Sequence, residues 1–176
     1  MSTKNEPQYK VKGVVDLGEF EVNYDQTIVE KLAALDRRRV FGSHRFITDE
    51  VFPDDRKGQK TWKASVVMFD QDIIAEVYLQ EWASKNNKIL ARLKEGIDIV
   101  RSLLHPGVAL MGAVPFVMAG QINANRAATY DLAPTFVGGH AGFTFNVIMT
   151  NYPRMYFTDR FRFLILEEPS PQGDLF

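Results

Sequence analysis

The chain has 176 residues, of which 45% are apolar and 24% charged, and its formal net charge is −1. This composition is typical of one soluble globular domain, and it supplies no overall positive field that would attract nucleic acid or a membrane. The sequence contains no cysteine, which excludes disulfides, thiolate catalysis and cysteine-ligated metals. The polar N-terminus lacks the apolar segment of a signal peptide, and the longest apolar run, residues 108–120, is too short to cross a bilayer. We therefore expect a cytoplasmic protein with no membrane partner.

The N-terminal quarter of the chain predicts a strand followed by a helix. Residues 9–22 read as one bent strand or a hairpin whose bend points are glycines. A helix is expected over residues 25–39, because a Thr and a Glu near its start have capping-box spacing and an apolar stripe follows. Three arginines would occupy its last turn and a glycine would end it. These residues are Gly13 and Gly18 in the strand, then Thr27, Glu30, Ile28, Leu32, Leu35, Arg37, Arg38 and Arg39 in the helix, with Gly42 as its stop.

Residues 43–52 predict a further strand, and residues 53–60 a charged turn. The segment "TWKASVVMFDQDIIAEVYLQEW" (61–82) then changes its hydrophobic period in the middle. Its first half alternates like a strand with one buried face, and its second half has the spacing of an amphipathic helix, capped by Asp70 or Asp72. A second helical stripe covers residues 88–104, although its Gly96 costs about 1 kcal/mol relative to alanine.

The C-terminal part of the chain has the pattern of strands and loops. One or two short strands are expected near residue 115, and the stretch "NANRAATYDLAP" reads as irregular. Residues 136–149 and 154–166 predict an antiparallel hairpin joined through "TNYP". The expected fold is α+β, with a mainly antiparallel sheet or sandwich flanked by two or three helices. It comprises a polar arm (1–8), a single domain (9–166) and a tail (167–176).

No set of residues has the spacing of a known catalytic or metal motif. His44, His105 and His140 fall in different predicted elements, without HxH or HExxH spacing. The glycine-rich "FVGGHAGF" precedes a strand rather than a helix, so it predicts a hairpin turn and not a phosphate site. We therefore expect no catalytic residue, no metal and no cofactor. A small enzyme or ligand-binding domain that uses His140 and Asp131 stays open as an alternative.

Two segments combine basic and aromatic side chains. "DRRRVFGSHRF" (36–46) has the residue types that bind single-stranded nucleic acid, but its short length favours a solvated helix end or a subunit contact. Residues 152–166 carry the aromatic, Met and Arg side chains that are enriched in protein–protein interfaces, although a strand with outward-facing arginines explains them equally well. The candidate interface residues are Arg154, Met155, Tyr156, Phe157, Arg160, Phe161 and Arg162.

The C-terminal "QGDLF" resembles the short peptide with which bacterial replication proteins bind the sliding clamp. The resemblance implies that Gln172, Leu175 and Phe176 are the anchors of such a peptide. The protein would then be a replication- or repair-associated binding module with the clamp as its partner. A disordered acidic tail is the alternative.

The segment 61–82 resembles the tail tube proteins of contractile-tailed bacteriophages. In that family, a strand with an early tryptophan leads through an acidic corner to a short helix with a tryptophan near its end. Here Trp62, "VVMFDQD" and Glu81–Trp82 hold those places. The resemblance implies two β-sheets flanked by a helix, in a subunit that stacks as hexameric rings into a tube for DNA. The two extra predicted helices would suit a tail terminator or another neck or baseplate component.

We therefore expect a structural, self-assembling virion protein without catalysis, assembled in the host cytoplasm. Its partners would be copies of itself, other virion proteins, and DNA that passes without specific binding. A tube lumen should present acidic or polar side chains, because cationic ones would bind phosphate. The candidate lumen residues are Asp49, Glu50, Asp54 and Asp55.

Overall fold

The computed structural model describes residues 9–37, 40–73, 76–104, 116–125, 130–139, 142–151, 157 and 159–170. The fold is α+β, as predicted. The helices are α1 (Ile28–Ala33), α2 (Glu76–Lys85) and α3 (Leu93–Leu103). The strands are β1 (Val11–Asn23), β2 (Val40–Ser43), β3 (Gln59–Phe69), β4 (Ile89–Leu90), β5 (Phe116–Val117), β6 (Asn123–Asn125), β7 (Tyr130–Gly139), β8 (Gly142–Asn151) and β9 (Arg162–Glu167). The predicted arm (1–8) and the last six residues of the predicted tail lie outside the described residues.

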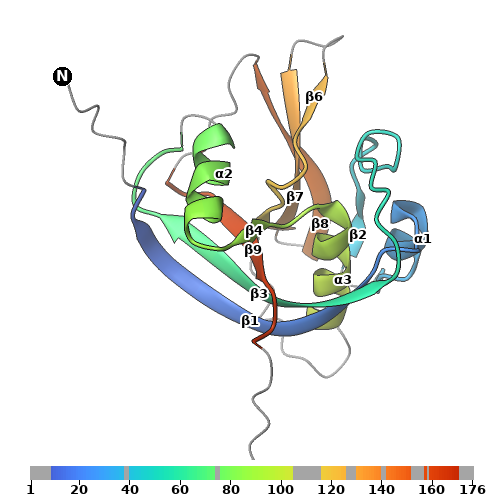
Figure 1. The fold of residues 1–176 in the computed structure, drawn as a ribbon. Helices are drawn as coiled ribbons and strands as arrows, with labels where there is room; N and C mark the ends of the chain where they lie inside the picture. The colour runs from blue at the N-terminus through green and yellow to red at the C-terminus, as the bar shows by residue number, and fades with distance from the viewer. Residues whose placement is uncertain are drawn as a thin grey trace, which may run out of the picture.

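The described strands belong to one hydrogen-bonded sheet (Figure 1). Its order is β1-β3-β9-β5-β7-β8-β2, with β4 paired to β9 and β6 paired to β7. Most neighbours are antiparallel, as predicted, whereas β5–β9 and β2–β8 run parallel, so the sheet is mixed. The tail tube resemblance implied two separate sheets, whereas the described strands form one.

β1 is a single strand at one edge of the sheet, and its glycines bend it as predicted. The pairing with β3 shifts register between Val11 and Gly13 and again between Asp16 and Gly18. Gly18 has φ +96°, a conformation that favours glycine, and its amide donates to Asp16 Oδ1 at 2.9 Å. Two bulges thus let a 13-residue strand curve around the core.

The C-terminal strands pair differently from the prediction. The antiparallel hairpin is β7–β8, which closes where Gly139 pairs with Gly142, so the glycine-rich segment does lead into a hairpin turn. The hairpin predicted between residues 136–149 and 154–166 is wrong, because β9 pairs with β3, β4 and β5 instead. The stretch predicted to be irregular contains β6 and the start of β7.

α1 is much shorter than the helix predicted over residues 25–39. Thr27 is its N-cap, and the predicted capping box with Glu30 is formed. The helix ends at Ala33, because Leu35 turns into the core, where it is 7% exposed. Arg37 therefore lies in a turn beyond the helix rather than in its last turn, and residues 38–39 are outside the described part.

β2 forms the other edge of the sheet, parallel to β8. Gly42, which was predicted to end a helix, lies inside this strand with φ +144°. The strand predicted over residues 43–52 is also wrong. The chain after Ser43 forms turns, in which Ile47 and Phe52 are buried.

The segment 61–82 forms a strand and then a helix, as predicted. The strand alternates only at first, because β3 lies between β1 and β9 and its second half is covered on both faces. Trp62 packs into the core cluster that contains α3. Trp82 packs on a second cluster, with its ring 4.9 Å from that of Phe69. The tryptophans thus anchor different clusters of the core.

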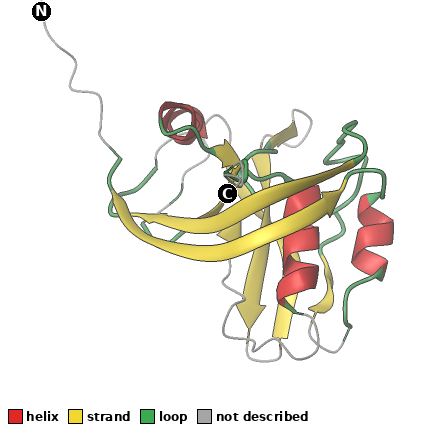
Figure 2. Ribbon diagram, turned by 60° about the horizontal axis from the view of Figure 1, so that its bottom comes forward, coloured by secondary structure: helices red, strands yellow, loops and turns green. Residues whose placement is uncertain are grey.

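α3 begins later than the helix predicted over residues 88–104, because β4 pairs with β9 just before it. The helix packs within the bend of the sheet, and most of its residues are buried (Figure 2). Gly96 is needed there, since a Cβ at this position would lie 2.0 Å from Met118 Sδ. The buried residues of α3 include Lys94, Glu95 and Asp98, so this helix carries charge into the core.

Candidate functional site

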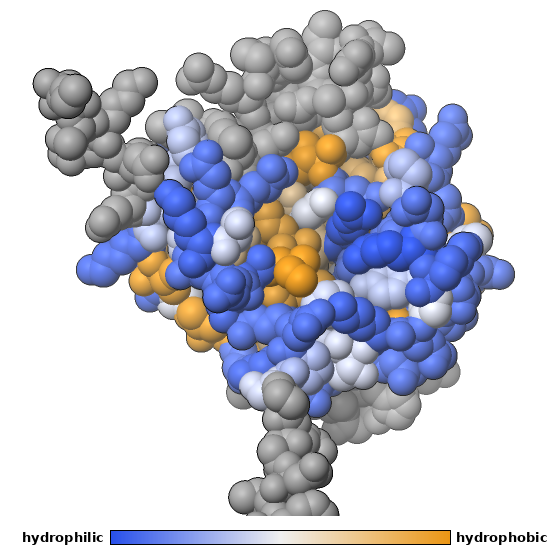
Figure 3. Space-filling model, in the orientation of Figure 1, coloured by the Kyte–Doolittle hydropathy of each residue, from blue (hydrophilic) through white to orange (hydrophobic). Residues whose placement is uncertain are grey.

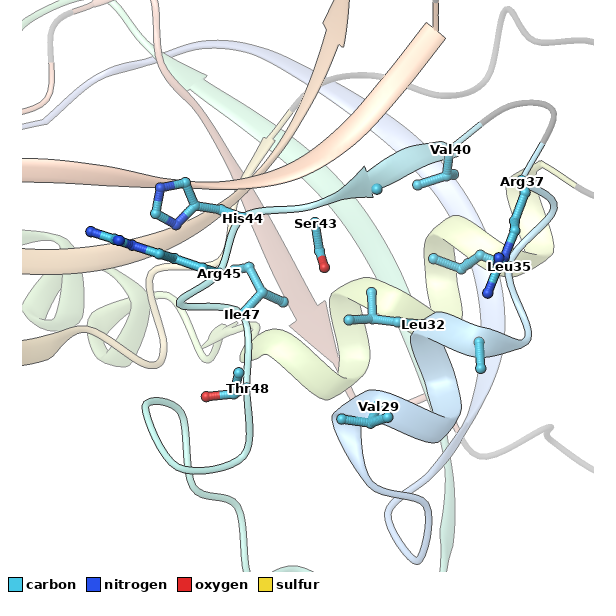
Figure 4. A pocket seen from close by; sticks show the side chains of 12 residues that line it. Val29, Leu32, Leu35, Arg37, Val40, Ser43, His44, Arg45, Ile47 and Thr48 are labelled. Atoms are coloured by element: carbon cyan, nitrogen blue, oxygen red, sulfur yellow. The ribbon is translucent and has the colours of Figure 1, made fainter.

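An open cavity of about 590 Å³ lies between α1 and β2 (Figure 4). The described residues that line it all come from the segment 29–48. This cavity is termed the α1–β2 cup. Its volume falls within the range of small-ligand pockets, roughly 300–1,000 Å³.

Hydrogen bonds at the two ends of the cup hold its walls together. At one end, the two carboxylate oxygens of Asp49 accept the amide of Ile28 at 3.1 and 2.9 Å. At the other end, the amide of Val40 donates to the carbonyl of Asp36 at 3.0 Å. Residues 28–49 therefore form a closed ring around the cup, with α1 and β2 as opposite walls.

The inside of the cup is largely apolar. Leu35, Val40 and Ile47 are 7%, 5% and 2% exposed and form its deep part, whereas Val29 is 64% exposed at the rim. Figure 4 shows the side chains of Leu32 and Ser43 directed into the space between the walls. A ligand in the cup would meet aliphatic side chains and the hydroxyl groups of Ser43 and Thr48.

Positive charge borders the cup, and none of its described lining residues carries a carboxylate. Arg37 is exposed and lies beside Leu35 (Figure 4), and no carboxylate of the described residues pairs with it. Arg45 lies with its guanidinium 5.0 Å from the centre of the Phe46 ring. His44 Nδ1 accepts the amide of Phe46 at 3.3 Å. The border of the cup therefore favours an anion.

Behind the cup, a buried ion pair fastens α1 to α3. Lys31 Nζ bonds Asp98 Oδ2, and both side chains are 0% exposed. The same oxygen accepts the amide of Asn23 at 3.0 Å, and Arg101 approaches the other oxygen at 3.2 Å. Burial lowers the pKa of Lys31, and the bond to Asp98 offsets part of that effect. The pair therefore joins α1, α3 and the end of β1.

Tyr24 is the centre of a second buried network. Its hydroxyl donates to Glu95 Oε1 at 2.7 Å and accepts from Trp62 Nε1 at 2.8 Å. Arg56 Nη1 lies 3.3 Å from the same oxygen. Burial, together with the charge of Glu95, raises the pKa of Tyr24 well above its ordinary value. The phenol is therefore held in its neutral form.

Arg56 extends this network to the loop before β3. Its guanidinium bonds the carboxylates of Asp54 and Glu95, and Lys94 Nζ donates to the carbonyl of Tyr24 at 2.9 Å. Burial alone would raise the pKa of Asp54, but the bonds and charge of Arg56 bring that pKa below its ordinary value. The network thus ties this loop to α3 and β1.

Most polar atoms of these buried groups bond one another, although Asp98 Oδ1 has an ion-pair neighbour in Arg101 and no hydrogen bond among the described residues. Each carboxylate in the two networks has a cationic neighbour, and the Tyr24 hydroxyl both donates and accepts. A group that transfers protons to a substrate must be able to reach it, and these are engaged inside the fold. Among the described residues, no three metal-ligating side chains are grouped for a metal ion either. We therefore assign both networks to stability.

Another open cavity, of about 300 Å³, lies at the start of β9 and is termed the β9 slot. Side chains of β5, β7 and β8 line it together with three of the predicted interface residues, Arg160, Phe161 and Arg162. No carboxylate of the described residues pairs with either arginine. The slot is thus an apolar hollow with a cationic border.

The remaining predicted interface residues divide into two groups. Phe157 is 0% exposed and packs against the rings of Phe161 and Phe163 at 5.5 and 5.1 Å, so its assignment to an interface is corrected to the core. Arg154, Met155 and Tyr156 lie outside the described residues.

The predicted lumen residues differ in how far they are exposed. The Asp54 carboxylate is 0% exposed, so this residue cannot line a channel, and its prediction is corrected. Asp49 is half-buried and binds the start of α1. Glu50 and Asp55 are exposed, and their lumen role stays a prediction.

Several other predicted residues lie outside the described part of the chain. These are Gln172, Leu175 and Phe176 of the clamp-type peptide, the histidines His105 and His140, and the side chain of Asp131. The prediction that Asp70 or Asp72 caps α2 is wrong, because Ile73 after them forms a bridge with Phe157 and the helix begins at Glu76. Asp72 accepts the amide of Asp159 at 2.8 Å. Clamp binding and a pocket at His140 therefore stay predictions.

Sequence reasoning missed both the cup and the buried networks. One signal for the networks was present: Lys31 lies three residues after Ile28 and four before Leu35, on the apolar stripe of the predicted helix. A lysine at such a position requires a buried carboxylate partner. The cup left no comparable signal, because it depends on the pairing of β2 with β8.

The surface of the face in Figure 3 is hydrophilic at its borders and apolar near its centre, over β4. Ile89 of β4 is 42% exposed, and Tyr78 of α2 is 37% exposed. In the part of the chain that is described, no helix combines the length and apolar character needed to cross a membrane. No protein-family model, curated protein or solved structure matches the chain.

Proposed function

We propose that the protein is a structural subunit that assembles with copies of itself through the β9 slot. The observation that carries this proposal is the composition of the slot. It is an open apolar hollow bordered by Phe161 and by two arginines without carboxylate partners among the described residues. Aromatic and arginine side chains are enriched at protein interfaces and dominate their binding energy.

Charge complementarity favours a second copy as the occupant. Glu50 and Asp55 are exposed in the loop before β3, and no described cation pairs with either carboxylate. This acidic loop of one copy is suited to the arginines of the slot in the next. Such a contact joins two different surfaces, so repeated copies close into a ring or extend as a filament. The resemblance of residues 61–82 to tail tube proteins leads us to propose a specific type of assembly, in which the subunits form a ring around a DNA channel.

The edge of β1 is poorly suited to assembly by strand addition. Both of its bulges interrupt the regular backbone spacing, and Lys12, Asp16 and Glu19 are exposed along it. Bulges and charges are features with which proteins protect sheet edges from pairing. Assembly through a face and its loops is therefore the better-supported route.

The test is the size of the full chain in solution, measured by mass photometry and electron microscopy. We expect rings or filaments for the unmodified protein and monomers for the double variant Arg160→Glu/Arg162→Glu. Adding Glu50→Lys and Asp55→Lys to that variant should restore assembly by exchanging the charges. Lys12→Glu is the matched control, because it reverses an exposed charge on β1 and should leave assembly unchanged. An unmodified protein that stays monomeric at all concentrations would contradict the proposal.

A further inference from the structure

We propose that the α1–β2 cup binds a single-chain amphiphile with an anionic head group, represented most simply by a medium-chain carboxylate. This inference is independent of self-assembly, because the cup and the β9 slot share no residues. It rests on the shape of the cup, its apolar interior and its unpaired cations.

The interior of the cup suits an aliphatic chain. Leu35, Val40 and Ile47 supply a buried apolar floor, and Leu32 projects from α1 over it. Val29, at 64% exposure, adds an exposed apolar side chain at the rim. Covering these side chains with methylene groups removes apolar surface from water on both partners, so affinity should rise about fourfold for each added methylene.

The head group is assigned from charge. Arg37 is the cation at the end of the cup beside Leu35, and it has no carboxylate partner among the described residues. Arg45 adds a second positive side chain at the border. A guanidinium can bind both oxygens of a carboxylate at once, and the Ser43 hydroxyl, directed into the cup, can donate a further hydrogen bond. Among the described lining residues, no acidic side chain opposes an anion.

The closed ring favours a short ligand over a polypeptide. The Asp49–Ile28 hydrogen bonds join the walls at one end, and the turn from α1 to β2 joins them at the other. A peptide strand that added to β2 would have to leave past one of these ends. A single-chain ligand can lie wholly between them, with its head at Arg37 and its chain toward Ile47.

Titration calorimetry on the full chain tests the proposal with four probes below their aggregation concentrations. Decanoate should bind with one site per chain, and octanoate about fifteenfold more weakly because two methylenes are lost. Decyltrimethylammonium, which has the same chain with a positive head, should bind at least tenfold more weakly than decanoate. Acetate, which has the head alone, should show no saturable binding.

Two variants locate the site. Arg37→Gln should weaken decanoate binding about tenfold without weakening the binding of decyltrimethylammonium, because only the anionic head group loses an attractive partner. Ser43→Phe should abolish binding of both, because the new ring fills the cup from an exposed strand position. The matched control is Lys12→Gln, which removes an exposed cation of β1 outside both the cup and the β9 slot and should leave binding unchanged. Circular dichroism confirms that each variant is folded.

Three results would overturn the inference. Equal affinity for decanoate and decyltrimethylammonium would show that charge is not recognised. Decanoate binding that persists in Ser43→Phe would place the ligand outside the cup. Binding to phosphatidylglycerol vesicles or to oligo(dT), with none to monomeric decanoate, would assign the arginines to a membrane surface or to nucleic acid.

Discussion

Lys31 of α1 and Asp98 of α3 form an ion pair in which neither side chain is exposed. Removing water from two charges costs several kcal/mol for each ion, and that cost is recovered only while both partners are present. The pair therefore makes the position of α1, and with it one wall of the cup, depend on a single residue of α3.

We expect Lys31→Met to lower the free energy of unfolding by about 3–5 kcal/mol, because it leaves the Asp98 carboxylate buried without its main partner. Urea denaturation measures this loss. The double variant Lys31→Met/Asp98→Leu should recover most of it, since neither charge then remains. If the single variant loses less than about 1 kcal/mol, the pair does not fasten α1 in solution.

Tyr24→Phe should lower the free energy of unfolding by about 1–3 kcal/mol at neutral pH, because Glu95 and Trp62 lose a buried hydrogen-bond partner. Tyr78→Phe is the control, since Tyr78 is 37% exposed and its change should stay within about 0.5 kcal/mol.

Tyr24 should also make the free energy of unfolding depend on pH in the alkaline range. The fold raises the pKa of Tyr24, so the folded protein keeps a proton that the unfolded chain releases above its ordinary pKa of 10.0. The stabilisation is fully present below pH 10 and is lost as the pH rises above it. The stability of the unmodified protein should therefore fall more steeply above pH 10 than that of Tyr24→Phe. Parallel curves would contradict the shift.

Asp54 should make the protein lose stability as the pH falls into the acid range. Its pKa lies below the ordinary value of 3.8 in the folded protein, so the stabilisation is present above that pH and lost as the pH falls below it. Unfolding measured from pH 6 to pH 2 should show a stability gap between the unmodified protein and Asp54→Asn that narrows below about pH 4. Asp55→Asn, at an exposed neighbouring position, should show no such gap.

Gly96→Ala should destabilise the protein by about 1–3 kcal/mol, although alanine is the better helix former by about 1 kcal/mol. The reason is the Met118 side chain, whose sulfur would lie 2.0 Å from the new Cβ. Thermal unfolding measures the effect, with Ser102→Ala on the exposed side of α3 as the control. Met118→Ala should reverse the sign of the Gly96→Ala effect by removing the obstacle.

Features encoded by neighbouring residues were predictable. The Thr27–Glu30 capping box, the bends at Gly13 and Gly18 and the glycine hairpin turn depend on residues a few positions apart, and all are present in the structure. Backbone hydrogen bonding and steric freedom decide such features locally.

Features set by distant partners were not predictable in this way. Ile89 and Leu90 continue the helical period of α3, but β9 recruits them as a strand. The helix at residue 28 stops early because Leu35 enters the core and Val40 pairs with β8. The α1–β2 cup results from these two long-range contacts, so no local sequence pattern predicts it.

The place of β9 in the sheet also has a consequence for how the protein is made. β9 is the last of the described strands along the chain, yet it lies between β3 and β5 and holds β4 as well. Until residues 162–167 have been synthesised, the sheet consists of two separate parts, β1–β3 and β5–β7–β8–β2. The strands that will flank β9, which are β3 and β5, then have unpaired backbone groups. Pairs such as Lys63 with Glu167 join residues far apart in sequence, which slows folding. The sheet therefore cannot be completed before residues 162–167 are available, and nascent chains are most exposed to aggregation just before this strand emerges.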